Sequence, residues 1–62
     1  MPGFLAIQAA DYYFLGEIEK SKKLYLQAFY VYDAYEDAIN REVMRQEMKK
    51  YFGIEMPEYS VS

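Results

Sequence analysis

A long stretch without glycine or proline, from Glu17 to Phe52, most constrains what this chain can fold into. Glycine and proline are the residues that most disfavour a helix interior, so their absence leaves helix formation unopposed. Apolar side chains in the first half of the stretch recur at intervals of three and four, which is the spacing of one helical face. Gly16 and Gly53 bracket the stretch as helix ends, and together these features predict an all-α protein.

The segment before Gly16 predicts a separate helix with little polar surface. Residues 4–15 are apolar except for Gln8 and Asp11. These two lie three positions apart, on one stripe of a helix, and Pro2 suits the first helical turn. A helix that exposes only one polar stripe to solvent is expected to pack against other protein surfaces on its remaining sides. We therefore expect this first helix to be central to an assembly.

The sequence leaves open whether residues 17–52 form one helix or two. The segment from Asp33 to Glu36 has the capping-box pattern, in which an acceptor side chain and a glutamate three residues later bind the first amides of a new helix. This pattern favours a tight turn at residues 33–37 that starts a third helix. The lack of glycine and proline is also compatible with one continuous helix.

The helical region has a clear end. Gly53 can take the left-handed conformation that closes a helix, and Pro57 prevents the helix from resuming. We therefore expect one helical domain over residues 1–54 and an extended or disordered tail over residues 55–62.

Composition indicates that the folded chain leaves apolar surface exposed. A chain of 62 residues buries only about 60% of its unfolded surface. In this chain 53% of the residues are hydrophobic, with eight tyrosines and four phenylalanines. Small domains compensate with a disulfide, a metal or association, and the absence of cysteine and histidine removes disulfides and zinc sites. Self-association or a permanent protein partner is the remaining way to cover the surface.

Residues 5–35 carry a regular pattern of small and large side chains. Small residues stand at Ala9, Ser21 and Ala28, where paired helices would cross, and Gly16 separates the two helices. Aromatic residues accompany them at Tyr12, Tyr25 and Phe29. The pattern resembles one tetratricopeptide repeat, a helix-turn-helix unit of about 34 residues. The resemblance implies an antiparallel helical hairpin, although a generic hairpin also needs small residues at its crossing.

The chain departs from the repeat pattern at two places. Leu5 stands where the family has an early tryptophan, and Asp33 and Ala34 stand where it has a proline after the second helix. Members of the family stack several repeats and bind peptides in a concave groove. The resemblance therefore implies that a single unit associates with itself or with a larger protein. The residues expected to hold the hairpin are Phe4, Leu5, Tyr12, Leu24, Tyr25, Ala28 and Phe29.

The last helical stretch has two apolar sides. Tyr35, Ile39 and Val43 follow one line, and Met44, Met48 and Tyr51 follow another. One side can face the rest of the chain while the other faces a partner. Aromatic and methionine side chains are enriched at the centres of protein interfaces. The residues predicted to contact a partner are Tyr30, Tyr32, Tyr35, Met44, Met48 and Tyr51.

Catalysis, metal binding and membrane insertion have little support in the sequence. Cysteine and histidine are absent as nucleophile, base or soft-metal ligand. Asp33, Glu36 and Asp37 lack the spacing of a calcium loop, and no apolar run approaches the roughly 20 residues of a membrane span. The first residues lack the basic segment of a signal peptide. We therefore expect a non-enzymatic, cytoplasmic protein without cofactors.

The main functional expectation is protein–protein interaction, as a small adaptor, assembly factor or inhibitor. The alternative is a nucleic-acid-linked regulator whose cations contact phosphate. The cations that it would use are Lys20, Lys22, Lys23, Arg41 and Arg45. The net charge of −3 and the neighbouring Glu17 and Glu19 disfavour this alternative.

Overall fold

Three α-helices make up the part of the chain that the structure describes, which is residues 2–57 with side chains from residue 5 onward. In this computed structural model α1 spans Pro2–Phe14, α2 spans Ile18–Ala34 and α3 spans Ala38–Phe52. No strand occurs within residues 2–57, so the predicted all-α class is confirmed. The predicted turn before a third helix is also confirmed, since residues 35–37 separate α2 from α3.

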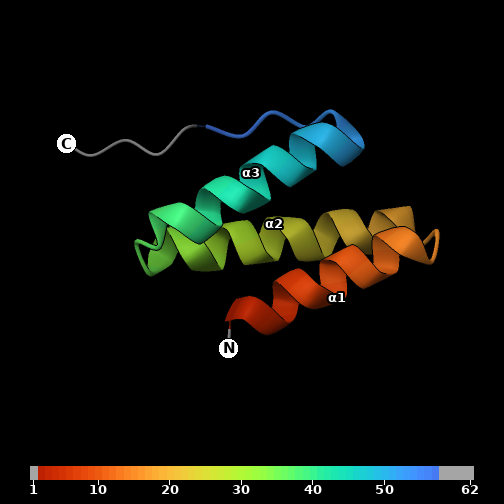
Figure 1. Cartoon of the computed structure of the whole chain (residues 1–62), viewed down its shortest axis with the longest axis horizontal. Coiled ribbons are helices and arrows are strands. Elements are labelled where there is room, and N and C mark those ends of the chain that lie inside the picture. Colours follow the sequence, from red (N-terminus) through yellow and green to blue (C-terminus); the bar gives the residue numbers. More distant parts are fainter. Residues whose placement is uncertain (1, 58–62) are drawn as a thin grey trace.

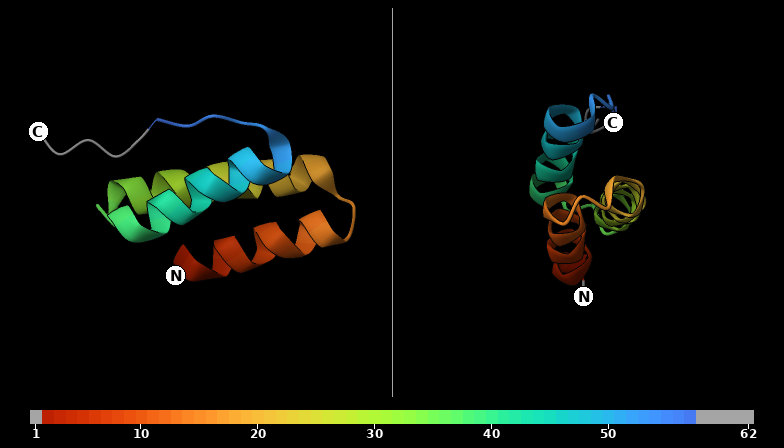
Figure 2. Two further views of the ribbon diagram at one scale, coloured as in Figure 1. Left: turned by 45° about the horizontal axis from the view of Figure 1, so that its top comes forward. Right: turned by 90° about the vertical axis from the view of Figure 1, so that its right-hand side faces the viewer.

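Helix α2 lies at the centre of the arrangement. It runs antiparallel to both α1 and α3 and packs against each of them (Figure 1). Figure 2 shows α1 and α3 on the same side of α2, one above the other. The second helix is therefore covered by two helices that lie next to each other. Within the chain the central helix is α2 and not α1, because α1 packs extensively only against α2.

Small side chains bring α1 and α2 into close contact. Ala9, Ser21 and Ala28 are fully buried, and the Ser21 hydroxyl donates a hydrogen bond to the Ala9 carbonyl oxygen at 2.7 Å. Small residues let the two backbones approach, and the bond gives the buried hydroxyl a partner. The predicted hairpin is therefore confirmed at its crossing.

The other residues expected to hold the hairpin are buried to different degrees. Tyr25 and Phe29 are buried, whereas Leu5, Tyr12 and Leu24 are half-buried. The side chain of Phe4 lies outside the described residues. The largest contribution to the hairpin core therefore comes from α2.

The two turns between helices have the same backbone hydrogen bonds. In the first turn the Glu17 amide donates to the Tyr12 carbonyl oxygen at 2.9 Å. In the second, the Asp37 amide donates to the Tyr32 carbonyl oxygen at 2.9 Å. These bonds satisfy carbonyl groups at the helix ends. The chain therefore reverses its direction twice with the same type of turn.

Each turn holds one residue in the left-handed backbone conformation. Gly16 has a φ of 83° and Glu36 has a φ of 58°. Glycine adopts this conformation without strain, whereas a residue with a Cβ atom is disfavoured there. The second turn thus forms at a residue type that gives no sequence signal for it. This is why the sequence left the boundary between α2 and α3 open.

Helix α3 begins at a different cap from the one that the sequence suggested. Asp37 is the N-cap, and its carboxylate accepts hydrogen bonds from the Asn40 amide at 3.3 Å and the Asn40 side chain at 2.7 Å. Asp33 remains inside α2, so the capping box from Asp33 to Glu36 is wrong. The Asp33 carboxylate instead accepts a hydrogen bond from Nε of Arg41 at 2.8 Å. That bond joins α2 to α3.

Helix α3 packs on α2 through its methionine side. Met44 and Met48 are buried in the core. Beside them Arg41 is only 5% exposed, and its guanidinium carbon lies 4.5 Å from the centre of the Phe29 ring. A paired arginine over an aromatic ring contributes packing as well as charge. Arg41 is therefore part of the α2–α3 contact.

The end of α3 follows the sequence prediction. Gly53 is left-handed with a φ of 70°, and the Ile54 amide donates to the Met48 carbonyl oxygen at 3.3 Å. Ile54 and Met56 then pack against the core. The folded part thus extends into the predicted tail as far as Met56, and residues 58–62 lie outside the described residues.

Ser21 offers a test of the α1–α2 crossing. Ser21→Leu adds bulk at a fully buried position, and we expect it to lower the free energy of unfolding by about 2–3 kcal/mol. Ser21→Ala keeps the small size and removes only the hydrogen bond to Ala9, so we expect a loss of about 1 kcal/mol. Urea unfolding followed by circular dichroism measures both variants. Equal losses would contradict a tightly packed crossing.

Glu36 and Gly16 provide a matched pair for the left-handed turns. Glu36→Gly relieves the strain of a Cβ atom at positive φ, and we expect a gain of about 0.5–1 kcal/mol after the extra flexibility of the unfolded chain is subtracted. In Gly16→Ala the added Cβ atom meets no other atom within 4 Å. It imposes the same strain at positive φ, however, and should lower the free energy of unfolding by about 1 kcal/mol. Urea midpoints measure both shifts. A stabilising Gly16→Ala would show that the first turn is not left-handed.

Candidate interaction surface

Three of the residues predicted to contact a partner lie in the core of the chain itself. Tyr32 and Met44 are 4% exposed, and Met48 is fully buried. All three belong to the core cluster between the helices, so their assignment to a docking surface is corrected. The sequence revealed two apolar sides of α3, and it could not tell which one the rest of the chain covers.

The other three predicted contact residues do not form one surface. Tyr30 and Tyr35 are 59% and 74% exposed. Tyr30 lies two positions before the buried Tyr32 on α2 and so points about 200° away from it around the helix axis, whereas Tyr35 lies in the turn after α2. Tyr51 is half-buried, and its ring stacks on Tyr13 with 4.3 Å between the ring centres. These tyrosines are therefore dispersed over the molecule.

A row of exposed side chains runs along α1 on the side opposite α2. It consists of Ile7, Asp11 and Phe14, which we call the α1 ridge. Ile7 is 62% exposed and Phe14 is 75% exposed. Both Ile7 and Asp11 lie two positions from the fully buried Ala9, and two positions correspond to about 200° around a helix. The α1 ridge therefore points away from the core.

A second exposed row runs along α3. It consists of Ile39, Val43, Gln46 and Lys50, which we call the α3 ridge. Ile39 is 79% exposed and Val43 is 41% exposed, and Gln46 and Lys50 are exposed as well. The buried Arg41 lies two positions from both Ile39 and Val43, on the opposite side of the helix. The α3 ridge therefore also points away from α2.

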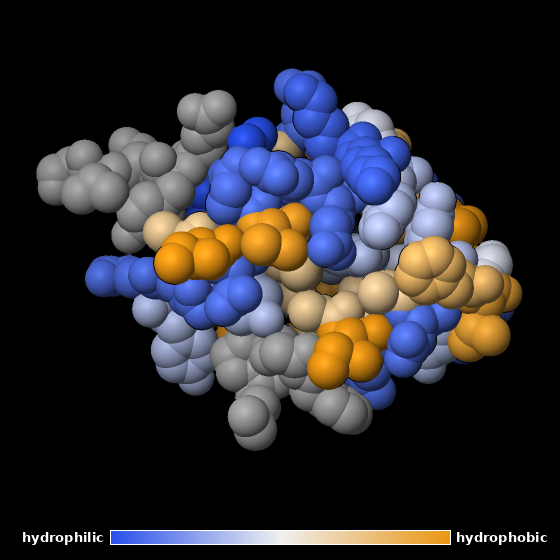
Figure 3. Space-filling model, in the orientation of Figure 1, coloured by the Kyte–Doolittle hydropathy of each residue, from blue (hydrophilic) through white to orange (hydrophobic). Residues whose placement is uncertain are grey.

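Both ridges project from one face of the molecule, which we call the α1–α3 face. Because α1 and α3 lie on the same side of α2, side chains opposite α2 point in the same direction (Figure 2). Figure 3 views this face, and hydrophobic colour gathers on it at the left, below the centre and at the right. Leu15, which is 73% exposed, follows Phe14 in the first turn. The face thus combines apolar side chains from two helices.

A shallow hollow of about 260 Å³ lies along α3 beside its ridge. Its lining residues are Val43, Gln46, Glu47, Lys50 and Tyr51. One end of α3 is tied to α1 there, because the Tyr51 ring stacks on Tyr13. The hollow is therefore bounded by the aromatic contact between α1 and α3.

A buried tyrosine fixes the carboxylate at this hollow. The Tyr25 hydroxyl, on α2, donates a hydrogen bond to Oε1 of Glu47 at 2.8 Å. Burial raises the pKa of Tyr25, and the hydrogen bond and the negative charge of Glu47 raise it further. Burial also raises the pKa of Tyr32, with the charge of Asp37 adding to the effect. Tyr25 thus stays a hydrogen-bond donor that holds α3 on α2.

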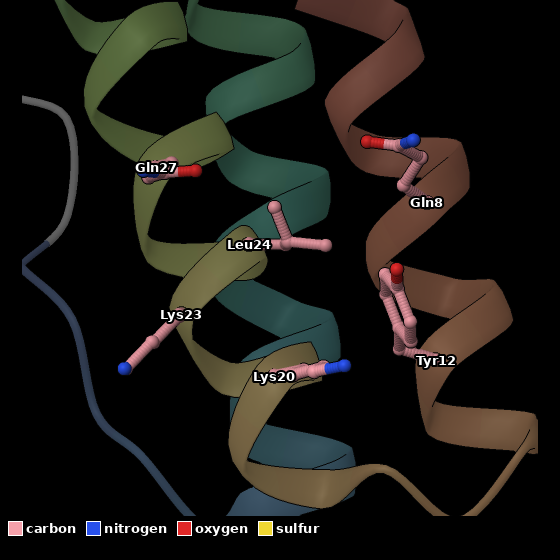
Figure 4. A pocket seen from close by; sticks show the side chains of 6 residues that line it. All are labelled: Gln8, Tyr12, Lys20, Lys23, Leu24 and Gln27. Carbon is pink, nitrogen blue, oxygen red and sulfur yellow. The ribbon is translucent and has the colours of Figure 1, made fainter.

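A second hollow, of about 310 Å³, lies between α1 and α2 on the other side of α1. Its lining residues are Gln8, Tyr12, Lys20, Lys23, Leu24 and Gln27. In Figure 4 the Lys20 side chain points toward Tyr12, whereas Lys23 points away from the hollow. Lys20 lies 3.3 Å from a Glu17 oxygen and 5.5 Å from the centre of the Tyr12 ring. The cation nearest to the hollow is therefore already paired.

The cations proposed for phosphate contact do not form one basic face. Arg41 is buried and pairs with Asp33. Nε of Arg45 donates to Glu42 at 2.7 Å, and hydrogen bonds from Arg45 and Gln46 lower the pKa of Glu42 to about 2. On α2 the Lys20 and Lys22 side chains pair with Glu17 and Glu19. Carboxylates thus offset most of the positive charge on which this alternative depends.

Within residues 2–57 no group of three or more aspartates and glutamates could hold a metal ion, and no helix there is long and apolar enough to cross a membrane. No family model, curated protein or solved structure matches the chain.

The pH dependence of unfolding tests the burial of Tyr25 and Tyr32. Their pKa values are raised above 10.0 in the folded chain, so the folded state holds these protons more tightly than the unfolded state. Their contribution to stability is complete below about pH 10 and is lost as the pH rises above it. We expect both to ionise only as the helical signal disappears, which paired tyrosinate absorbance and circular dichroism measure.

Tyr25→Phe is the control for this titration. The variant has one fewer late-ionising tyrosine, so its free energy of unfolding should fall less steeply as the pH rises above about 10. Ionisation of all eight tyrosines while the helices remain intact would contradict the burial of Tyr25 and Tyr32.

Proposed function

We propose that this protein is a non-catalytic interaction module that binds another protein surface through its α1–α3 face. The observation that carries the proposal is the alignment of Ile7, Phe14, Ile39 and Val43 along two neighbouring helices on one side of the molecule. Single exposed apolar residues are common on soluble proteins, whereas an aligned set on one face is typical of an interaction site. Two parallel rows of side chains also suit the packing of a partner's helices.

The polar residues of the ridges support the same function. Three exposed polar residues lie among the apolar side chains, namely Asp11, Gln46 and Lys50. An apolar centre with a polar rim is the usual composition of a protein interface. We propose that these residues orient the partner, while the apolar side chains contribute most of the binding free energy.

A tetratricopeptide-like arrangement fits this function. The two turns share their hydrogen bonds, and α1 and α3 lie on the same side of α2. Both features support the proposal that α1 and α3 are successive first helices of repeat-like pairs. Stacked repeats form an extended binding surface, which agrees with a role as an adaptor, assembly factor or inhibitor.

The polar groups of the hollow along α3 favour a non-catalytic role. Tyr25 and Glu47 are bonded to each other, and this bond connects α2 to α3. A general acid or base must reach a substrate in a concave pocket, and both groups here are engaged in holding helices together. We therefore assign them to stability.

Photocrosslinking in an extract of the cells that make the protein tests the proposed function. A photoreactive benzoyl-phenylalanine in place of Ile39 stands on the α3 ridge, and the same residue in place of the exposed Lys23 on α2 is the control. We expect protein adducts at position 39 and none at position 23, because only the first lies on the α1–α3 face. Mass spectrometry identifies the adducts. Equal yields at both positions, or none at position 39, would count against the face.

A further inference from the structure

We infer that the occupant of the α1–α3 face is a second copy of this chain, in a dimer that places α1 of each copy over α3 of the other. The inference rests on the proposed function, because it names the partner of the same face. Three observations carry it: the exposed apolar area, the opposite charges of the two ridges, and the heights at which these charges stand along the helices.

The exposed apolar area is close to what a dimer needs. Ile7, Phe14, Leu15, Ile39 and Val43 are between 41% and 79% exposed. At about 200 Å² for a fully exposed large side chain, they offer roughly 650 Å². A stable interface buries about 800 Å² on each partner, and the polar residues of the ridges supply the difference. The size of the face therefore agrees with that of a dimer interface.

The two ridges carry opposite charges. The α1 ridge has a carboxylate at Asp11, and the α3 ridge has an ammonium group at Lys50. Among the described residues neither side chain has an ion pair, and the Lys50 ammonium group lies 5.8 Å from the centre of the Tyr51 ring. Opposite charges on facing surfaces favour association and fix its register. The α1 ridge of one copy is thus complementary to the α3 ridge of another.

The charges stand at nearly the same height. Tyr13 stacks on Tyr51, and α1 and α3 run in the same direction, so both rings lean by a similar amount toward the N-termini of their helices. Residues 13 and 51 therefore mark one level. Asp11 lies two residues before Tyr13 in α1, and Lys50 lies one residue before Tyr51 in α3. The heights of the two charged residues along the helix axis therefore differ by about 1.5 Å.

In the proposed dimer a two-fold axis runs parallel to the helices and between the two ridges. Such an axis can bring Asp11 and Lys50 together because they lie at nearly the same height. It places α1 over α3 of the second copy and keeps every height unchanged. Asp11 then faces Lys50 of the second copy, and the same contact recurs on the other side of the axis. With a rise of about 1.5 Å per residue, Ile7 falls between the levels of Val43 and Gln46 on the opposite ridge. The contact between Ile7 and Val43 is thus formed together with the two charged contacts, whereas Ile39 and Phe14 lie towards the two ends of the interface.

A dimer with like ridges facing each other fits less well. Asp11 lies midway between Ile7 and Phe14 on the α1 ridge. An antiparallel pairing of two α1 ridges that overlaps these apolar side chains fully therefore sets Asp11 against Asp11. Like charges placed directly together oppose association. The charges of the face favour α1 over α3.

Exchanging the two charges tests this arrangement. Asp11→Lys alone and Lys50→Glu alone each create like-charge contacts on both sides of the axis, and we expect each to raise the dimer Kd by about tenfold. The double variant restores opposite charges and should return the Kd to within about threefold of the parent. Sedimentation equilibrium at low salt measures the constants, because salt screens exposed charges.

Lys23→Glu is the matched control. It makes the same charge change as Lys50→Glu at an exposed residue outside the face, so the Kd should stay within about twofold of the parent. Circular dichroism verifies that every variant is folded. Ile7→Glu places a charge in the apolar part of the face and should abolish the dimer while the helices remain.

The possible results separate this inference from the proposed function. Sedimentation as a monomer at every concentration would contradict the inference that a second copy occupies the face. A double variant that dimerises no more tightly than the single variants would contradict it as well. Adducts at position 39 with a different protein would keep the proposed function while rejecting the second copy. Adducts between two copies, together with recovery in the double variant, support both.

Discussion

The close crossing of α1 and α2 is the contact on which the rest of the structure depends. Ala9 and Ser21 are fully buried there, and the hydroxyl of Ser21 is bonded to the backbone of α1. Because these side chains occupy little space, α1 lies close to α2, and α3 packs on α2 beside it. The second turn repeats the hydrogen bonds of the first, so α3 returns to the same side of α2 as α1. The shared face of α1 and α3 is a consequence of this geometry.

The charged and apolar groups on the surface of α2 determine which side of α3 packs against it. Arg41 reaches both the Asp33 carboxylate and the Phe29 ring. An arginine is buried only when its charge has a partner, and α2 supplies that partner beside an apolar surface for Met44 and Met48. With this side of α3 turned inward, Ile39 and Val43 necessarily face outward. The apolar row on α3 is thus exposed because the opposite side of the helix packs on α2.

The aromatic residues link these contacts to the interaction surface. Tyr25 holds Glu47 through its hydroxyl, and Tyr13 stacks on Tyr51 where α1 and α3 approach. The stack fixes the relative height of the two helices, and it thereby aligns Asp11 with Lys50. Half of the residues that the sequence indicated for an interface are used inside the chain, and a different set of apolar residues is left for a partner.

The sequence by itself determined the helices and the hairpin. Periodicity, the small residues at positions 9, 21 and 28, and the cap at Gly53 are local signals that few alternatives can satisfy. The break after α2 was partly predictable, but its true cap at Asp37 was hidden because Glu36 takes a conformation usually marked by glycine. Only the tertiary structure decided which apolar side of α3 is core and which residues form the exposed face. Two apolar sides of one helix have equivalent spacing, and the choice between them depends on the shape and charge of the helix against which they pack.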